Sequence, residues 1–127
     1  MSRSCLFLFL LIPLFGCETL HQFTQTIQNT TSETIVLSFA NESLNYYPDS
    51  ISIAPNSIET IYSFEKFGAQ AEGLGCGIIG NDVRVRIESG KTLNKDINQL
   101  ENWNQELSGR RTVVENCSFS IEAADIQ

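Results

Sequence analysis

Basic residues are scarce in this sequence of 127 residues, which has 8 Lys and Arg against 15 Asp and Glu and a formal net charge of −7. Phosphates of nucleic acids and anionic lipid headgroups repel an acidic protein. The composition therefore argues against nucleic-acid binding. It also predicts that any membrane contact depends on something other than a basic patch.

Histidine and clustered cysteines are equally scarce. The single histidine is His21, and no closely spaced cysteine pair accompanies it. Metal sites usually need three or four ligands of this kind, and nucleophilic catalysis usually relies on a histidine base. We therefore expect no metal, no cofactor and no catalytic role. His21 is predicted to be a solvated residue close to the N-terminus.

Carboxylates keep one enzymatic alternative open. Asp82 with Asp96, or Glu88 with Asp96, are predicted on neighbouring strands, where paired acids suit a glycosidase-like hydrolase. Most such acids are solvated surface charges, and perturbed functional carboxylates are the minority. A non-catalytic protein is therefore the first expectation and the hydrolase the alternative.

No apolar run approaches the roughly 20 residues that a membrane-spanning helix needs. The N-terminal apolar run extends from Cys5 to Ile12, with Arg3 before it and Gly16-Cys17 shortly after it. A basic start, a short hydrophobic region and a small residue at the cleavage point are the three parts of a signal peptide. A buried first helix would be apolar on all sides, which a small domain covers poorly. The pattern predicts a signal peptide over residues 1–16.

The residues Leu14-Phe15-Gly16-Cys17 resemble the lipobox of bacterial lipoproteins. The resemblance implies that Cys17 becomes the lipidated first residue of the mature chain. Arg3 is the only charged residue of the predicted signal peptide. After its removal 7 basic and 15 acidic residues remain, a net charge of −8. Two or more acyl chains on one residue give stable membrane anchoring. We predict a lipidated tether over residues 17–22 and one domain over residues 23–127.

Two cysteines remain after Cys5 leaves with the signal and Cys17 is lipidated. Cys76 and Cys117 then stand in an oxidising compartment, where an even pair favours a disulfide. Two buried free thiols are the alternative. A bond would fix the glycine-rich segment around Cys76 to the core.

Hydrophobic residues alternate with polar ones along most of the chain, a period typical of half-buried strands. Short strands with closely spaced turns predict an all-β antiparallel sandwich of about seven strands, with a small barrel as the alternative. We expect two successive hairpins, because antiparallel strands need only short connections. The predicted strands are 23–28, 34–39, 50–53, 58–64, 82–88, 92–97 and 113–121.

The segment from Phe67 to Asn81 interrupts this pattern and is predicted to be a long loop. Its residues Gly75 to Gly80 match the spacing of dinucleotide-binding glycines, but that motif needs a strand before it and a helix after it. Neither is predicted, so we interpret the glycines as positions that permit positive φ near the disulfide.

Aromatic residues beside loops are the candidates for a recognition surface, which would suit a protein or glycan partner. Adjacent residues on a strand point to opposite faces, so Tyr46 and Tyr47 are the preferred candidates. Trp103 is predicted to fill the core, because tryptophan is highly buried on average. The other candidates are Tyr62 and Phe67.

Several short segments resemble small outer-membrane lipoproteins of the Bacteroidetes type. Besides the lipobox, these are Ile53-Ala54-Pro55-Asn56, Ser89-Gly90-Lys91-Thr92-Leu93, Asn102-Trp103 and the ending Cys117 to Ile126. The resemblance implies an immunoglobulin-like or related sandwich on the periplasmic or outer face of the outer membrane, and no established activity. It also implies that Ser50, in Asp49-Ser50-Ile51, is an O-glycosylation acceptor. The sequence thus predicts a lipid-anchored binding or accessory module of the cell envelope.

Overall fold

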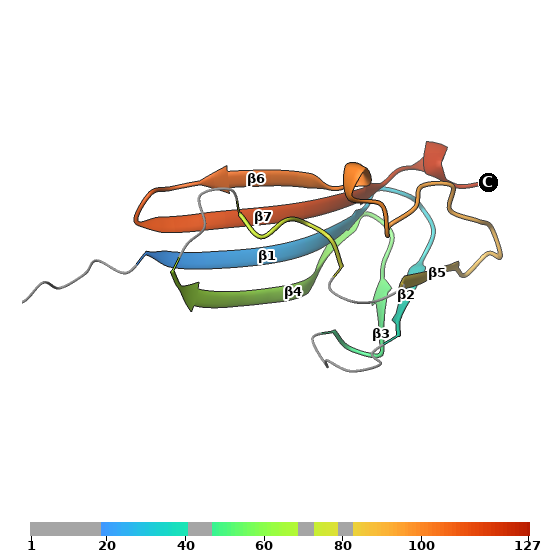
Figure 1. The fold of residues 1–127 in the computed structure, drawn as a ribbon. Coiled ribbons are helices and arrows are strands. Elements are labelled where there is room, and N and C mark those ends of the chain that lie inside the picture. The colour runs from blue at the N-terminus through green and yellow to red at the C-terminus, as the bar shows by residue number, and fades with distance from the viewer. Residues whose placement is uncertain (1–18, 41–46, 69–72, 79–82) are drawn as a thin grey trace, which may run out of the picture.

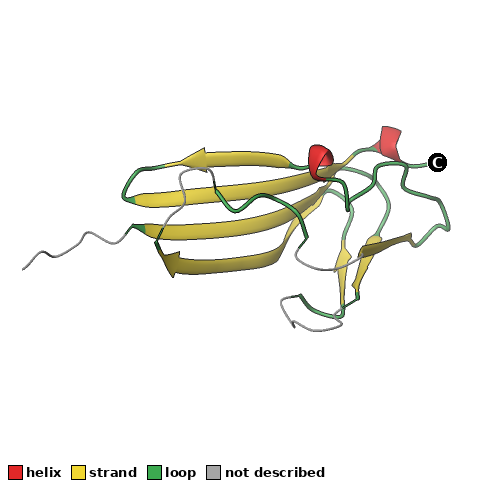
Figure 2. Cartoon of the chain, viewed as in Figure 1, coloured by secondary structure: helices red, strands yellow, loops and turns green. Residues whose placement is uncertain are grey.

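Strands dominate the computed structural model, which describes residues 19–40, 47–68, 73–78 and 83–127. These residues form seven strands and two short 3-10 helices (Figures 1 and 2). The strands are β1 (Leu20–Asn29), β2 (Ile35–Phe39), β3 (Ser50–Ile53), β4 (Ser57–Phe67), β5 (Val83–Ile87), β6 (Asn104–Ser108) and β7 (Thr112–Ile121), and the helices are η1 (Leu100–Asn102) and η2 (Ala123–Asp125). The predicted seven-stranded β-sandwich is confirmed, but it is not wholly antiparallel, because β1 pairs with β7 in parallel.

The strands form two separate sheets and not a closed barrel. One sheet has the order β4-β1-β7-β6 and the other the order β3-β2-β5. Figure 1 shows the long strands of the first sheet side by side, with β2 and β3 near the end where the C-terminus lies. The buried apolar residues of both sheets, except Val113 of β7, belong to one hydrophobic core.

Strand β1 shows why this sequence forms a sandwich. Its inward positions alternate strictly with half-buried outward positions, as expected for a strand with one face in the core. The inward set is His21, Phe23, Gln25, Ile27 and Asn29. Since the strand begins at Leu20, the predicted tether over residues 17–22 extends too far and the domain begins earlier than residue 23.

The two predicted hairpins are wrong, because β1–β2 and β3–β4 each connect one sheet with the other. A buried asparagine explains the first crossing. The Asn29 amide nitrogen donates to the carbonyl oxygens of Glu33, Ile53 and Ala54 at 2.8, 3.3 and 3.0 Å, and its side-chain oxygen accepts from the Thr31 backbone nitrogen at 3.0 Å. These bonds hold both inter-sheet connections at one corner of the sandwich.

A β-bulge in β4 changes which residues face the core. The β1–β4 register shifts between Gln25 and Thr26, so that Ile61 is the extra residue on β4. A single inserted residue reverses the alternation beyond it. Ile58 is therefore 61% exposed, whereas Tyr62 and Phe64 pack against the core. Strict alternation along the predicted strand 58–64 would place Ile58 on the same face as Tyr62 and Phe64, but the bulge places it on the other face.

The segment after β5 also differs from expectation. Residues 92–97 form no strand, and Leu93 contributes only an isolated bridge to Ile126. The chain then turns through η1, and Trp103 enters the core, 8% exposed, with its indole N–H donating to the Ile97 carbonyl at 2.8 Å. The predicted core position of Trp103 is confirmed.

Candidate functional site

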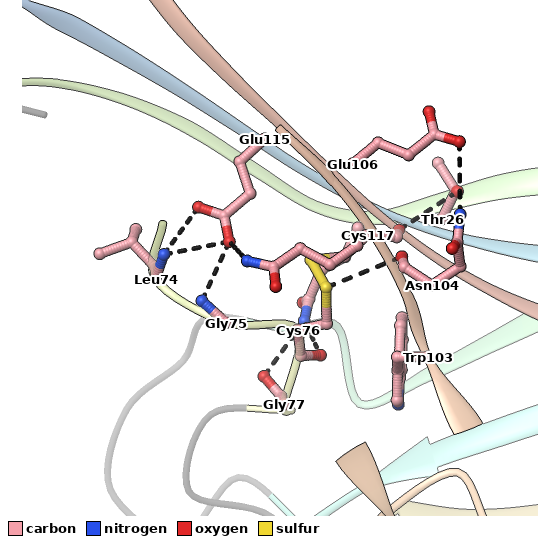
Figure 3. The surroundings of a disulfide bond; sticks show 12 residues. Thr26, Leu74, Gly75, Cys76, Gly77, Trp103, Asn104, Glu106, Glu115 and Cys117 are labelled. Atoms are coloured by element: carbon pink, nitrogen blue, oxygen red, sulfur yellow. Dashed lines mark hydrogen bonds between the residues drawn. A yellow bond between two sulfur atoms is a disulfide. The ribbon is translucent and has the colours of Figure 1, made fainter. Parts of the chain in front are cut away.

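Cys76 and Cys117 form the predicted disulfide. Their Sγ atoms are 2.06 Å apart and their Cα atoms 5.3 Å apart, across 41 residues of sequence. Cys117 lies on the inward face of β7, so the bond attaches the segment 73–78 to the sheet (Figure 3). Gly73 and Gly75 have φ values of 76° and 84°, as predicted for glycines near the disulfide, but Gly77 does not have a positive φ.

The carboxylate of Glu115 holds the same segment from β7. It accepts hydrogen bonds from the backbone nitrogens of Leu74, at 2.8 and 3.0 Å, and Gly75, at 2.9 Å (Figure 3). The Gln105 side chain donates a further bond at 2.8 Å. A Cβ atom at Gly73 would lie only 2.7 Å from a Glu115 oxygen, so glycine is required for this close approach.

His21 completes the shell around this carboxylate. Its Nε2 lies 2.8 Å from Oε2 of Glu115, and both side chains are fully buried. Its Nδ1 is buried and has no hydrogen-bond partner within the described ranges. The predicted solvated role of His21 is wrong, because the residue stands on the inward face of β1 and not in a tether.

Gln25 fastens the next two residues of the segment. Its amide nitrogen donates to the carbonyl oxygens of Cys76 at 2.9 Å and Gly77 at 3.1 Å. Its side-chain oxygen accepts a hydrogen bond from the Tyr47 hydroxyl at 2.8 Å. Each of the residues 74–77 is therefore held by a buried side chain or by the disulfide.

An apolar cleft of about 480 Å³ lies beside Phe23, the residue between His21 and Gln25 on the inward face of β1. Phe23 and Phe64 stack with ring centroids 5.2 Å apart, and Leu100 lies 65% exposed among the other lining residues. The remaining lining residues are Leu74, Gly75, Gly77 and Ile78. Because the segment directs its polar backbone atoms to Glu115 and Gln25, the cleft presents apolar surface to a ligand.

Tyr47, one of the aromatic residues predicted to form a recognition surface, lies in the core. Tyr47 is 4% exposed and stacks on Phe39 with centroids 4.8 Å apart. The prediction that Tyr47 belongs to a binding surface is wrong, because its ring packs in the core and its hydroxyl reaches Gln25. Tyr46 lies outside the described residues. Phe67, also a candidate, is 72% exposed.

Of the two predicted acidic pairs, the structure describes both residues only for Glu88 and Asp96, and these do not face each other across strands. Asp96 lies in a turn, and β2 is the strand beside β5, so the expected pairing with Glu88 is wrong. Asp82 lies outside the described residues. The Asn98 backbone N–H donates to Asp96 and holds the pKa of that carboxyl below its usual value. A hydrogen bond from Lys91 likewise lowers the pKa of Glu33.

Other features bear on membrane and metal binding. Cys17 lies outside the described residues, and Ser50 is exposed at the start of β3. No helix in the described ranges is long and apolar enough to cross a membrane. Within the same ranges, no three His, Cys, Asp or Glu side chains gather as metal ligands.

The network of His21, Gln25 and Glu115 was not predicted from the sequence. The available signal was the alternation of residues along each strand, which puts Gln25 and Glu115 on the same faces as apolar core residues. Comparison with known proteins adds no assignment: no protein-family profile, curated protein or solved structure matches this sequence.

Proposed function

We propose that this chain is an exported, lipid-anchored protein of the bacterial outer membrane that serves as a non-catalytic binding or accessory module. The lipobox at Leu14 to Cys17 supports the anchor. The disulfide between Cys76 and Cys117 supports export, because such bonds persist mainly in oxidising compartments.

The observation that carries the binding role is the fastening of residues 74–77 beside the apolar cleft. Glu115, Gln25 and Cys117 hold this short segment from two neighbouring strands of the sheet. Binding sites gain affinity when their walls are fixed before the ligand arrives. Clefts of several hundred cubic ångströms with mainly apolar walls suit small ligands or a partner's side chains.

The buried acid also favours binding over hydrolysis. A general acid needs access to the proton that it transfers. Glu115 and His21 are fully buried, and Glu115 already accepts bonds from two backbone nitrogens, one amide side chain and His21. Their arrangement supports a role in holding the wall of the cleft.

The lipid anchor predicts the behaviour of a Cys17→Ala chain in its native host. It should incorporate no labelled fatty acid, because the acylated sulfur is gone, and the intact chain should be labelled and recovered with the membranes. Cys5→Ala is the matched control, since Cys5 leaves with the signal and its loss should not affect labelling. A Cys17→Ala chain that still carries label would disprove lipidation at this residue.

The binding role predicts that charge in the cleft displaces partners. Leu100→Glu should remove the protein or glycan that co-purifies with the tagged, full-length chain after crosslinking in native membranes. Leu107→Glu is the control, because Leu107 is also exposed, at 41%, but lies on β6 and does not line the cleft. Equal recovery with both variants would contradict binding at the cleft.

A further inference from the structure

Three segments meet at the end of the sheet where β1 begins. Leu20 pairs with Phe67 of β4 on one side and with Thr112 of β7 on the other. The Leu20 backbone nitrogen donates to the Arg111 carbonyl at 3.0 Å, and Gly68 donates to the Thr19 carbonyl at 2.7 Å. Figure 1 shows this end opposite the C-terminus.

An exposed aromatic side chain and three basic side chains lie at this end of an otherwise acidic protein. Phe67 is 72% exposed although it is a large aromatic residue. Arg110 and Arg111 are exposed in the turn between β6 and β7, and half-buried Lys66 precedes Phe67. In the described part of the chain, no carboxylate forms an ion pair with any of these three basic residues. We call Leu20, Lys66, Phe67, Arg110 and Arg111 the anchor-proximal end.

The position of Cys17 brings this end to the membrane. Only two residues separate Cys17 from Leu20, and an extended chain spans at most about 3.5 Å per residue. A lipid on Cys17 would therefore hold Leu20 within about 10 Å of the bilayer surface. The membrane interface is thus the partner that this short connection selects.

We propose that the anchor-proximal end rests on the membrane surface, with Phe67 at the boundary of headgroups and acyl chains and the two arginines on lipid phosphates. The proposal rests on the lipid anchor proposed above, which would bring the arginines to the lipid although the net charge of the chain argues against membrane binding by a basic patch alone. Aromatic side chains are favoured at membrane interfaces, and the planar guanidinium group binds phosphate through paired hydrogen bonds. The contact would fix the orientation of the sandwich, with its C-terminal end pointing away from the bilayer.

The test places a tryptophan near each end of β4 in the lipidated, mature protein. Phe67→Trp probes the anchor-proximal end. Ile58→Trp is the matched control, since Ile58 is 61% exposed on the same strand and nine residues, about 30 Å, away. The proteins are reconstituted in phosphatidylglycerol vesicles whose acyl chains carry bromine, which quenches nearby indole emission. Trp103 is buried and contributes the same background to both variants.

We expect the brominated vesicles to quench the Phe67→Trp emission and to leave the Ile58→Trp emission as it is in vesicles of the same lipid without bromine. Equal quenching of the two variants, or none, in protein that stays with the vesicles would overturn this proposal alone. Protein that does not stay with the vesicles would contradict the lipid anchor as well.

A second measurement tests the arginines. In the Phe67→Trp background, quenching should be stronger in phosphatidylglycerol vesicles than in phosphatidylcholine vesicles, because each basic residue near an anionic surface strengthens association about fivefold. Replacing Arg110 and Arg111 by Gln should remove this difference. The same change at Arg84 and Arg86, exposed on β5, is the control and should leave it intact. A difference that survives in both double variants would overturn the role of the arginines.

Discussion

Replacing Glu115 by Ala should lower the free energy of unfolding by about 3–5 kcal/mol, a large part of the stability of a domain of this size. The side chain is fully buried and accepts bonds from the backbone of Leu74 and Gly75, from Gln105 and from His21. Removing the acceptor leaves the buried His21 nitrogen and the part-buried backbone nitrogens of Leu74 and Gly75 without this partner, and a buried donor without a partner carries a desolvation penalty. Urea unfolding followed by circular dichroism measures the loss.

Two further variants make this result specific. Glu106→Ala removes an exposed acid of the neighbouring strand β6 and should change stability by no more than about 0.5 kcal/mol. Glu115→Gln keeps the shape but loses the charge, so it should lie between them, at about 1–3 kcal/mol. The structural role of Glu115 is refuted if its Ala variant unfolds at the same urea concentration as Glu106→Ala.

Opening the disulfide is expected to have a similar effect. The bond closes a loop of 41 residues, and the chain-entropy relation gives about 4 kcal/mol for a loop of that length. The double variant Cys76→Ser/Cys117→Ser should therefore unfold at a much lower urea concentration than the parent chain. Intact mass should rise by about two units on reduction, one hydrogen for each sulfur of the bond.

Hydrogen exchange separates this effect from general loss of structure. Without the disulfide, the amides of Leu74 and Gly75 keep their Glu115 partner but lose the covalent tie at Cys76. They should exchange faster, while the amides of β2 and β5, in the other sheet, should change only with global stability. A mass that stays unchanged on reduction would mean free thiols and would contradict the bond itself.

The two changes should not be additive. Glu115 and Cys117 lie two residues apart on β7 and hold neighbouring residues of the same segment. Once one tie is removed, the segment moves more freely and the other tie stabilises it less well. Interactions that share a structural unit show coupling of about 0.5–3 kcal/mol in double-mutant cycles.

Period-two alternation was sufficient to predict the sandwich, because each strand buries one face. Val83 and Ile87 on β5 and the inward positions of β7 lie where this pattern puts them. The disulfide followed from the number of cysteines and the expected compartment. What alternation gives is therefore the existence of strands and the face that each one buries.

Pairing between strands was not predictable in the same way. The composition of residues 29–33 indicates a turn, but whether the turn returns to the same sheet depends on the buried bonds of Asn29. The bulge at Ile61 likewise depends on the partner strand. Both features arise from contacts between segments distant in sequence.

The candidate site was missed because its polar residues were judged by composition. A lone histidine and a lone glutamate are usually solvated, and His21 and Glu115 become partners only when β1 and β7 lie side by side, 94 positions apart in sequence. Tyr47 was misplaced for a related reason, since its stacking on Phe39 and bond to Gln25 bring together three separate segments.

The parallel pairing of β1 with β7 sets the order in which this chain can fold. These two strands form the centre of the larger sheet, and they are the first and last strands in sequence. The sheet cannot close until residues near the C-terminus are available, and contacts of such long sequence separation form slowly. A chain still emerging from a ribosome therefore lacks the strand that completes its core. The core stays unformed until residues 112–121 have been synthesised.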